Sequence, residues 1–338
     1  MKSSKLLLTA FLGIASISVL ASTEAWTYDS TAKTLSWTDS TGFENVVSNV
    51  SAVGKDLTIN GSNGIDNTLL RNADFSVGIE DGYSLVKIGG NSISGNLSIT
   101  NMVLPSTMRY VDWFACCNLL NLETLILNEG LVSISDSFRA NPSLKNFSGL
   151  PSTLTTFGSP AFVSCTALNV EIDWPEGLTT IKADFGFTAI SAFRAPKGLI
   201  SIDGYAAFGG CTNLSYILLS DVFEYAGRRA FGDNAYIKVN QEIYFRCFPK
   251  RGFDPSVFEG GKSRAMTIHM EWGNREEWTK FAETNTVFYM DVPATFSGEG
   301  LMGKQNADGS LIDWSCIVNL KCWQDPEKKP KPLAVIIR

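Results

Sequence analysis

The chain is almost without histidine, since His269 is the only one among its 338 residues. Catalytic centres of the Ser/His/Asp or Cys/His type use a histidine as the base, and no such motif surrounds His269. The sequence also lacks a Cys-x-x-Cys pair, a histidine cluster and a Gly-x-x-x-x-Gly-Lys loop, which argues against the common zinc sites and phosphate-binding loops. We therefore expect a protein without enzymatic activity, without a metal and without another cofactor.

Positive charge is scarce as well. Lysine and arginine total 28 against 34 aspartates and glutamates, and the formal net charge is −6. A surface that binds nucleic acid is normally basic, so nucleic acid is not an expected partner. The 44% of hydrophobic and 18% of charged residues fit an ordered protein with a packed core.

Long apolar runs are absent beyond the N-terminus. There, Lys2 and Lys5 precede an apolar run from Leu6 to Leu20, and small residues follow up to Ala25. This order is typical of a Sec-type signal peptide, and the run is shorter than the about 20 residues of a membrane helix. We expect residues 1–21 to be removed, with cleavage as late as residue 25 also allowed.

Export without an anchor follows from this N-terminus. No cysteine follows the apolar run, so the chain is not expected to be a lipoprotein. Loss of the two lysines takes the net charge from −6 to about −8. The product is expected to be secreted, periplasmic or associated with the cell surface, with no membrane span after signal removal.

The chain repeats itself with a period of 23 or 24 residues. Phenylalanines recur at six positions: Phe114, Phe138, Phe162, Phe185, Phe208 and Phe231. An aliphatic residue precedes each of them, and another large apolar residue follows it three positions later, as in Leu178 and Ile181. Self-similarity of this length indicates a solenoid, in which each unit buries its apolar row only against its neighbours.

Each unit contains a short strand followed by a turn. Residues 122–127 and 214–219 both read Leu-x-x-Leu-x-Leu, the strand signature of a leucine-rich repeat. Pro or Gly closes most units, and the return segments are too short for long helices. We predict a leucine-rich-repeat solenoid, an α/β-type right-handed superhelix that is mostly β, with a concave sheet and short 3₁₀ or helical turns on the convex side.

A small polar residue stands three positions after each phenylalanine. These residues form a predicted polar ladder: Cys117, Asn141, Cys165, Thr188, Cys211 and Asn234. Neighbouring strands lie about 4.8 Å apart, so the cysteines on every second rung are separated by about 9 to 10 Å. A disulfide needs Cα atoms within about 7 Å. The three cysteines are therefore not expected to bridge one another. Their interchange with Asn and Thr favours a structural role, hydrogen bonding to buried backbone, over metal binding or nucleophilic catalysis.

The other cysteines are less regular. Cys116 adjoins the ladder, and Cys247 lies beyond the clear repeats. Cys316 and Cys322 are candidates for a local disulfide in an oxidising compartment. The total of seven cysteines leaves at least one thiol free.

Five segments are expected along the chain. After the signal peptide of residues 1–21, residues 26–82 are rich in Ser, Thr, Asn and Gly and predict a β-rich N-terminal cap. The repeats occupy residues 83–270. The repeats end in a last strand at 266–270. Residues 271–323 are expected to form a C-terminal cap, with a helix at 274–281, and a β-rich appendage. Residues 324–338 form a Pro/Lys tail, which we expect to be flexible.

The fullest copy of the repeat runs from Leu199 to Leu214 and reads Leu-Ile-Ser-Ile-Asp-Gly-Tyr-Ala-Ala-Phe-Gly-Gly-Cys-Thr-Asn-Leu. It resembles the repeat of BspA-like, or treponemal-type, leucine-rich-repeat proteins, over about residues 85–270. The resemblance implies the solenoid fold and an exported protein used for adhesion or other surface recognition. The chain departs from the pattern at the Asn rungs, in a shortened unit at residues 185–190 and at residues 236–262. Because functions within the family are diverse, the fold transfers better than the ligand.

The concave sheet is the expected binding surface, because alternate strand residues point away from the core. The strand pattern predicts these outward-facing side chains: Glu123, Ile126, Lys145, Ser148, Asp173, Ser215 and Leu218. We expect a monomer that binds a protein partner there. Two alternatives stay open. The first is glycan recognition by stacking of a sugar ring on one of four tryptophans: Trp26, Trp37, Trp113 or Trp174. The second is a structural component of the cell surface without a specific ligand.

Overall fold

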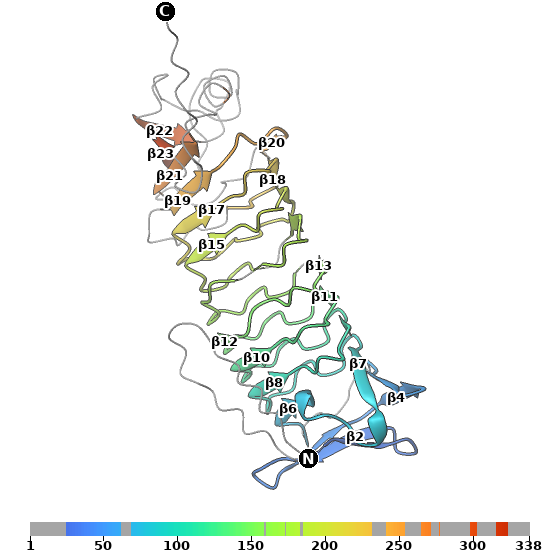
Figure 1. Cartoon of the computed structure of the whole chain (residues 1–338). Helices are drawn as coiled ribbons and strands as arrows, with labels where there is room; N and C mark the ends of the chain where they lie inside the picture. Colours follow the sequence, from blue (N-terminus) through green and yellow to red (C-terminus); the bar gives the residue numbers. More distant parts are fainter. Residues whose placement is uncertain are drawn as a thin grey trace, which may run out of the picture.

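The structure is a computed structural model that describes residues 25–61, 69–158, 160–172, 174–182, 185–231, 241–253, 265–271, 277, 298–302 and 316–323. Within these residues the chain winds into an elongated solenoid whose coils carry short strands on two opposite sides (Figure 1). The predicted solenoid is confirmed. No helix in the described part is long and apolar enough to cross a membrane.

One side of the solenoid, which we call the front face, carries two sheets. The N-terminal front sheet has four parallel strands: β6 (Asn72–Asp74), β8 (Asn101–Val103), β10 (Thr124–Ile126) and β12 (Asn146–Phe147). The C-terminal front sheet has six: β15 (Ala192–Arg194), β17 (Tyr216–Leu218), β19 (Gln241–Phe245), β21 (Ala265–Glu271), β23 (Cys316–Trp323) and β22 (Gly298–Met302), the last of them antiparallel. These are the strands of the predicted concave sheet.

The opposite side, the back face, also carries two sheets. The first contains β4 (Val50–Val53), β5 (Asp56–Ile59), β7 (Ser84–Ile88), β9 (Tyr110–Val111), β11 (Ser133–Ser135) and β13 (Thr156–Gly158). The second contains β14 (Thr180–Ile181), β16 (Ser201–Ile202), β18 (Tyr225–Ala226) and β20 (Gly252–Phe253). The return segments, expected as 3₁₀ or helical turns, thus form short strands. Two 3₁₀ helices, η2 (Phe75–Val77) and η3 (Glu80–Gly82), lie near the N-terminal end.

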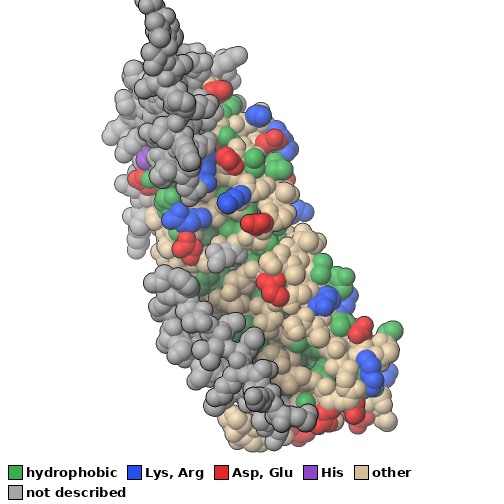
Figure 2. All heavy atoms as spheres, in the orientation of Figure 1, with side chains coloured by type: hydrophobic (Ala, Val, Ile, Leu, Met, Phe, Trp, Pro, Cys, Tyr) green, Lys and Arg blue, Asp and Glu red, His purple; other side chains and the backbone are tan. Residues whose placement is uncertain are grey.

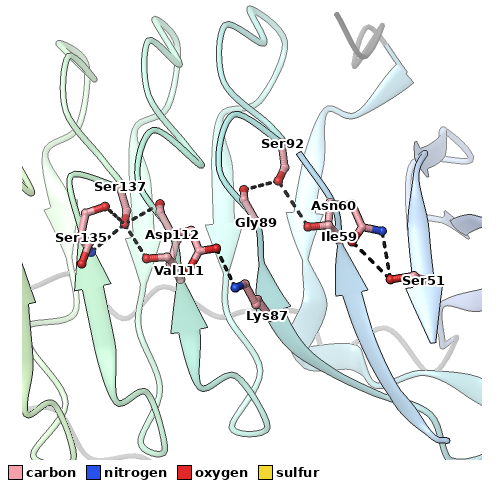
Figure 3. A network of polar contacts seen from close by, with 10 residues as sticks. All are labelled: Ser51, Ile59, Asn60, Lys87, Gly89, Ser92, Val111, Asp112, Ser135 and Ser137. Atoms are coloured by element: carbon pink, nitrogen blue, oxygen red, sulfur yellow. Dashed lines mark hydrogen bonds and ion pairs between the residues drawn. The ribbon is translucent and has the colours of Figure 1, made fainter. Parts of the chain in front are cut away.

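Side-chain hydrogen bonds join neighbouring coils along the back face (Figure 3). The Ser137 hydroxyl lies 2.8 Å from the Val111 carbonyl oxygen and 3.0 Å from that of Asp112. Lys87 forms an ion pair with Asp112 at 2.7 Å. Buried polar groups of one coil are therefore satisfied by the next coil, as burial requires.

The core is a column of phenylalanine rings, but its first member differs from the sequence prediction. Phe138 donates its backbone N–H to the Ala161 carbonyl, and Cys116 donates in the same way to Ser137. Cys116 therefore occupies the position of Phe138 in the preceding coil. Phe114 lies two residues upstream, half-exposed, and packs edge-on against Trp113.

Left-handed backbone turns flank this column. They occur two residues before the core position at Asn91, Phe114, Asp136, Ala206 and Arg229, and two residues after it at Gly95, Asn118, Ala140, Ser164, Phe187 and Gly210. The φ of Ala140 is 55° and that of Ser164 is 64°. Such angles are costly for residues other than glycine and persist only where surrounding contacts enforce them. The turns point the residue midway between them into the core.

The polar ladder lies just behind the phenylalanine column. Asn141 donates through Nδ2 to the carbonyls of Cys116 and Phe138, at 3.1 and 2.9 Å, and its Oδ1 accepts from the Leu119 N–H at 2.8 Å. Three other rungs, Cys165, Thr188 and Cys211, donate to phenylalanine carbonyls in the same way.

The predicted first rung of the ladder is wrong for the same reason as the predicted first ring of the column. Leu119 stands at that rung, three residues after Cys116, whereas Cys117 lies outside the ladder and its sulfur is 3.4 Å from the Asp136 carbonyl oxygen. Asn234 lies outside the described residues.

The buried cysteines are unreactive thiols. Cys116, Cys117, Cys165 and Cys211 carry no disulfide. Burial raises the pKa of Cys165 to about 12 and that of Cys211 to about 11, because a thiolate is poorly solvated in the core. These thiols stay protonated at neutral pH and belong to the core.

Cys316 and Cys322 are the first and seventh residues of one strand, β23. At about 3.3 Å per residue their Cα atoms are about 20 Å apart. A disulfide requires about 7 Å or less. The prediction of a disulfide between Cys316 and Cys322 is therefore wrong.

The N-terminal segment is β-rich, as expected of a cap. The strands β1 (Thr27–Asp29), β2 (Thr34–Thr38) and β3 (Glu44–Val47) form an antiparallel sheet. Trp26 packs on Trp37 and Phe75, with ring centroids 5.4 and 5.0 Å apart. The parallel pairing of β5 with β7 starts the first coil near residue 56, inside the segment expected to be the cap.

At the other end, β21 contains the predicted strand of residues 266–270. The strand β23 extends the front face by pairing with β21, and β22 pairs in turn with β23, so part of the expected appendage continues the solenoid. The signal peptide, the helix at 274–281 apart from Glu277, and the tail at 324–338 lie outside the described residues.

The corrected column predicts different effects for two phenylalanines. Phe162 is fully buried and stacks on Phe138 and Phe185, with ring centroids 5.7 and 5.6 Å apart. Phe162→Ala should lower the free energy of unfolding by about 3 to 5 kcal/mol, because it leaves a cavity between two rings. Phe114→Ala, which removes a half-exposed ring, should cost less than half as much. Urea unfolding followed by circular dichroism measures both, and equal losses would contradict the register described above.

The buried thiols should resist alkylation in the folded protein. At pH 8 on the order of one Cys165 thiol in ten thousand is ionised when its pKa is about 12. Iodoacetamide at pH 8, followed by peptide mass spectrometry, should leave Cys116, Cys165 and Cys211 unmodified in native protein and modify all three in guanidinium chloride. Rapid native modification of Cys165 would show that the ladder is open to solvent.

Candidate binding surface on the front face

The middle residue of each short front strand points into the core. Met102, Leu125, Ile217 and Ile243 are all fully buried. The residues on either side of them point outward, because strand side chains alternate. Cross-strand pairing aligns these outward residues into two columns that run along the solenoid axis.

In the N-terminal front sheet the outward surface is mostly uncharged. The first column there consists of Asn72, Asn101, Thr124 and Asn146. Asn101 donates through Nδ2 to Asn72 Oδ1 at 3.2 Å, and Asn146 donates to the Thr124 hydroxyl at the same distance. These side chains hydrogen-bond to one another along the sheet.

In the C-terminal front sheet the two columns carry aromatic and charged side chains. Four of them form what we call the aromatic row: Arg194, Tyr216, Tyr244 and His269. The Arg194 guanidinium lies 4.8 Å from the centre of the Tyr216 ring, and the Tyr216 and Tyr244 centroids are 5.1 Å apart. His269 stacks on Tyr244, with centroids 4.1 Å apart and planes 5° from parallel. The row therefore crosses the strands β15, β17, β19 and β21.

Glu242 holds the end of the row in place. Its Oε2 lies 2.6 Å from His269 Nε2 and accepts a hydrogen bond from the Tyr244 hydroxyl at 3.1 Å. Burial and the charge of Glu242 raise the pKa of Tyr244 to about 12, so this hydroxyl stays protonated and remains a donor. The aromatic row is thus rigid and is poorly suited to supply a nucleophile.

A break separates the two front sheets. Between β12 and β15 (Figure 1) the described residues of the coil at 168–174 form no strand. A shallow hollow of about 250 Å³ lies there, with Trp174 and Arg194 in its wall. Arg194 also forms an ion pair with Glu171, from Nε to Oε1 at 2.8 Å.

The residues predicted to face outward lie in several places. Ile126 belongs to the second column, and Ser148 follows directly after β12 in the same direction. Glu123 and Lys145 precede their strands and form an ion pair at 2.9 Å. Ser215 also precedes its strand and is half-buried.

Two further predicted positions differ. Leu218 is correctly placed in the second column but is only 8% exposed. It lies between Arg194 and Tyr244 in the cross-strand pairing, so the prediction of an exposed contact residue is wrong there. Asp173 lies outside the described residues.

All four residues of the aromatic row were missed as binding candidates, since His269 was considered only as a catalytic base. Tyr216 lies two residues before Leu218 in the same strand, so both side chains point outward. Applying the alternation from Leu218 would have identified Tyr216. Tyr244 and Arg194 carry no periodic signal, because they belong to units that depart from the full repeat. Cross-strand pairing places Arg194 and Tyr244 in one column on either side of Leu218, and the Tyr216 ring contacts both from the other column.

The four tryptophans considered for sugar stacking differ in exposure. Trp26 is fully buried and Trp37 is 5% exposed, so both belong to the N-terminal core and are corrected as sugar candidates. Trp113 is 57% exposed, and Trp174 is half-buried at the break.

Charges of both signs are interspersed over the face shown in Figure 2, without a large patch of one sign. Among the described residues, no group of three or more His, Cys, Asp or Glu side chains is placed to hold a metal ion.

The BspA type leucine rich repeat region matches residues 86–206 and 182–254, in six copies. Among solved structures, a leucine rich repeat protein of T. pallidum is similar, with 21% identity, 56% of this chain and 86% of that chain covered, and a TM-score of 0.45. A leucine-rich repeat protein from Bacteroides ovatus has 19% identity, coverage of 73% and 70%, and a TM-score of 0.41.

A leucine rich cell surface protein from Faecalibacterium prausnitzii has 11% identity, coverage of 72% of this chain and 88% of that chain, and a TM-score of 0.27. No curated protein matches the chain. The matched repeat region spans residues 86–254, half of the chain, and contains the phenylalanine column. The chain belongs to the family of proteins with BspA-type leucine-rich repeats.

Proposed function

We propose that the chain is an exported recognition protein that binds a protein partner through the C-terminal half of its front face, centred on the aromatic row. The observation that carries this proposal is the continuity of Arg194, Tyr216, Tyr244 and His269 across four strands. Tyrosine and arginine are enriched among the residues that dominate the energy of protein interfaces.

The rigidity of the row supports this role. Side chains that are already held in place lose little conformational entropy when a partner binds. The Glu242 carboxylate fixes Tyr244 and His269, whereas the Arg194 side chain is 54% exposed and available to a partner. The repeat family itself suggests recognition or binding, and its fold is typically non-catalytic.

Export is the second part of the proposal. Proteins with this repeat are usually secreted or located at the surface. The basic start, the apolar run and the small residues of positions 1–25 fit a Sec-type signal. Adhesion through the front face is the role we propose for the exported chain.

Partner binding should depend on Tyr216. The full exported chain is immobilised, and proteins from surfaces that it contacts are captured, identified and then titrated as purified proteins. Tyr216→Ala should raise the Kd by at least about tenfold, because a half-buried ring at the centre of the row is lost. The matched control is Asn101→Ala, which changes the corresponding column of the N-terminal front sheet. Unchanged binding by Tyr216→Ala, or an equal loss in the control, would overturn the proposed surface.

Processing of the N-terminus tests export. The chain recovered outside the cytoplasm should begin at Ser22, or as late as Trp26, when its N-terminal peptide is read by mass spectrometry. Leu8→Arg should retain the precursor inside the cell, because a charge interrupts the apolar run. Recovery of the chain with Met1 intact, in the cytoplasm alone, would refute the proposed signal.

A further inference from the structure

The hollow at the break of the front face is built differently from the rest of the solenoid. In the neighbouring coils an inward strand residue such as Phe193, which is only 3% exposed, covers the core. In the coil at 168–174 the described residues form no strand, and Trp174 precedes Pro175. A proline has no N–H to donate to a strand ladder, so the sequence does not favour continued pairing at this point.

Trp174 packs against the side of the phenylalanine column, and Ile172 of the same coil is also buried, with 8% of its surface exposed. The Trp174 ring lies 5.4 Å from Phe185 and 6.1 Å from Phe157, with the planes 81° apart in both pairs. Those two rings are stacked on each other, 17° from parallel. The Phe193 ring also lies perpendicular to Trp174, at 5.6 Å. Trp174 stays half-buried against these three rings, and its uncovered part lines the hollow.

The rim of the hollow is polar and its charges balance. Two carboxylates, Glu171 and Glu176, and two cations, Arg194 and Lys197, line it. Glu171 and Arg194 already pair at 2.8 Å, and both side chains are more than half exposed. A charged ligand would meet a group of its own sign, and a purely apolar ligand would desolvate the rim without replacing its hydrogen bonds. The hollow favours an uncharged ligand with many hydroxyl groups.

We propose that this hollow is a saccharide-binding subsite. A pyranose ring has an apolar C–H face and a rim of hydroxyl groups, which matches an aromatic floor with polar groups at its edge. The sugar ring stacks on the part of the Trp174 ring that lines the hollow. Its hydroxyls donate to the Glu171 carboxylate and accept from the Arg194 guanidinium.

This subsite lies beside the aromatic row and is separable from it. Arg194 is the one residue that contributes to both surfaces, whereas Trp174 and Glu171 contribute to the hollow alone. Saccharide binding goes beyond the proposed protein recognition, and the two can be tested with different variants.

The test uses the full exported chain on an array of neutral and acidic glycans, followed by calorimetric titration with the neutral oligosaccharide of the strongest spot. The expected result is binding to neutral saccharides, weakened at least tenfold by Trp174→Ala and by Glu171→Gln. Glu171→Gln keeps the shape of an exposed side chain and so tests the site without disturbing the core. Trp174→Leu keeps apolar cover over the phenylalanine column but removes the flat face, and it should weaken binding as Trp174→Ala does.

The control is Trp113→Ala, which removes an exposed tryptophan outside the hollow. It should bind the saccharide as the unchanged chain does. Absence of any bound neutral glycan at millimolar concentration would overturn the proposal, as would binding that survives both Trp174→Leu and Glu171→Gln. Preferential capture of acidic glycans would also count against it, because the balanced rim would then not be the selecting feature.

Discussion

Each coil of this protein is completed by its neighbours. Phe162 lies between Phe138 and Phe185, with centroids 5.7 and 5.6 Å away, and the backbone beside it bonds to adjacent coils. A single coil has too little apolar surface to form a core of its own. Because the hydrogen bonds join equivalent residues of successive coils, outward side chains of successive strands also fall into line. The aromatic row joins the two outward columns of the C-terminal front sheet. Tyr216 lies opposite Glu242 in one column, and its ring contacts that of Tyr244, which lies opposite Leu218 in the other column.

The period of the sequence was enough to predict the solenoid, because the core residue recurs once in each coil. The period was not enough to set the register of every coil. Ile134 and Ile202 occupy equivalent places in back strands, yet the core ring follows after four residues in one case and after six in the other, at Phe138 and Phe208. Counting from one phenylalanine to the next therefore selected Phe114, whereas the backbone turns select Cys116. The back strands escaped prediction because two or three residues are too short to show a period.

The candidate surfaces were only partly accessible from sequence. Strand alternation places Ile126 and Leu218 outward but does not reveal that neighbouring side chains bury Leu218. The hollow lies where the described residues of one coil, 168–172 and 174, form no strand, and the sequence signs of this are Trp174 and the proline after it. Its aromatic floor and balanced rim come from residues of two successive coils, so they are recognisable only once those coils are stacked.

The coil-to-coil pairing also has a consequence for how such a chain changes over evolutionary time. Gain or loss of one whole unit, about 23 residues, restores the same backbone contacts on both sides of the change and leaves every other coil in place. A unit added between β15 and β21 would lengthen the aromatic row by one side chain, while the hollow at the break would keep its geometry. The size of one surface and the identity of the other can therefore be selected independently within a single continuous core.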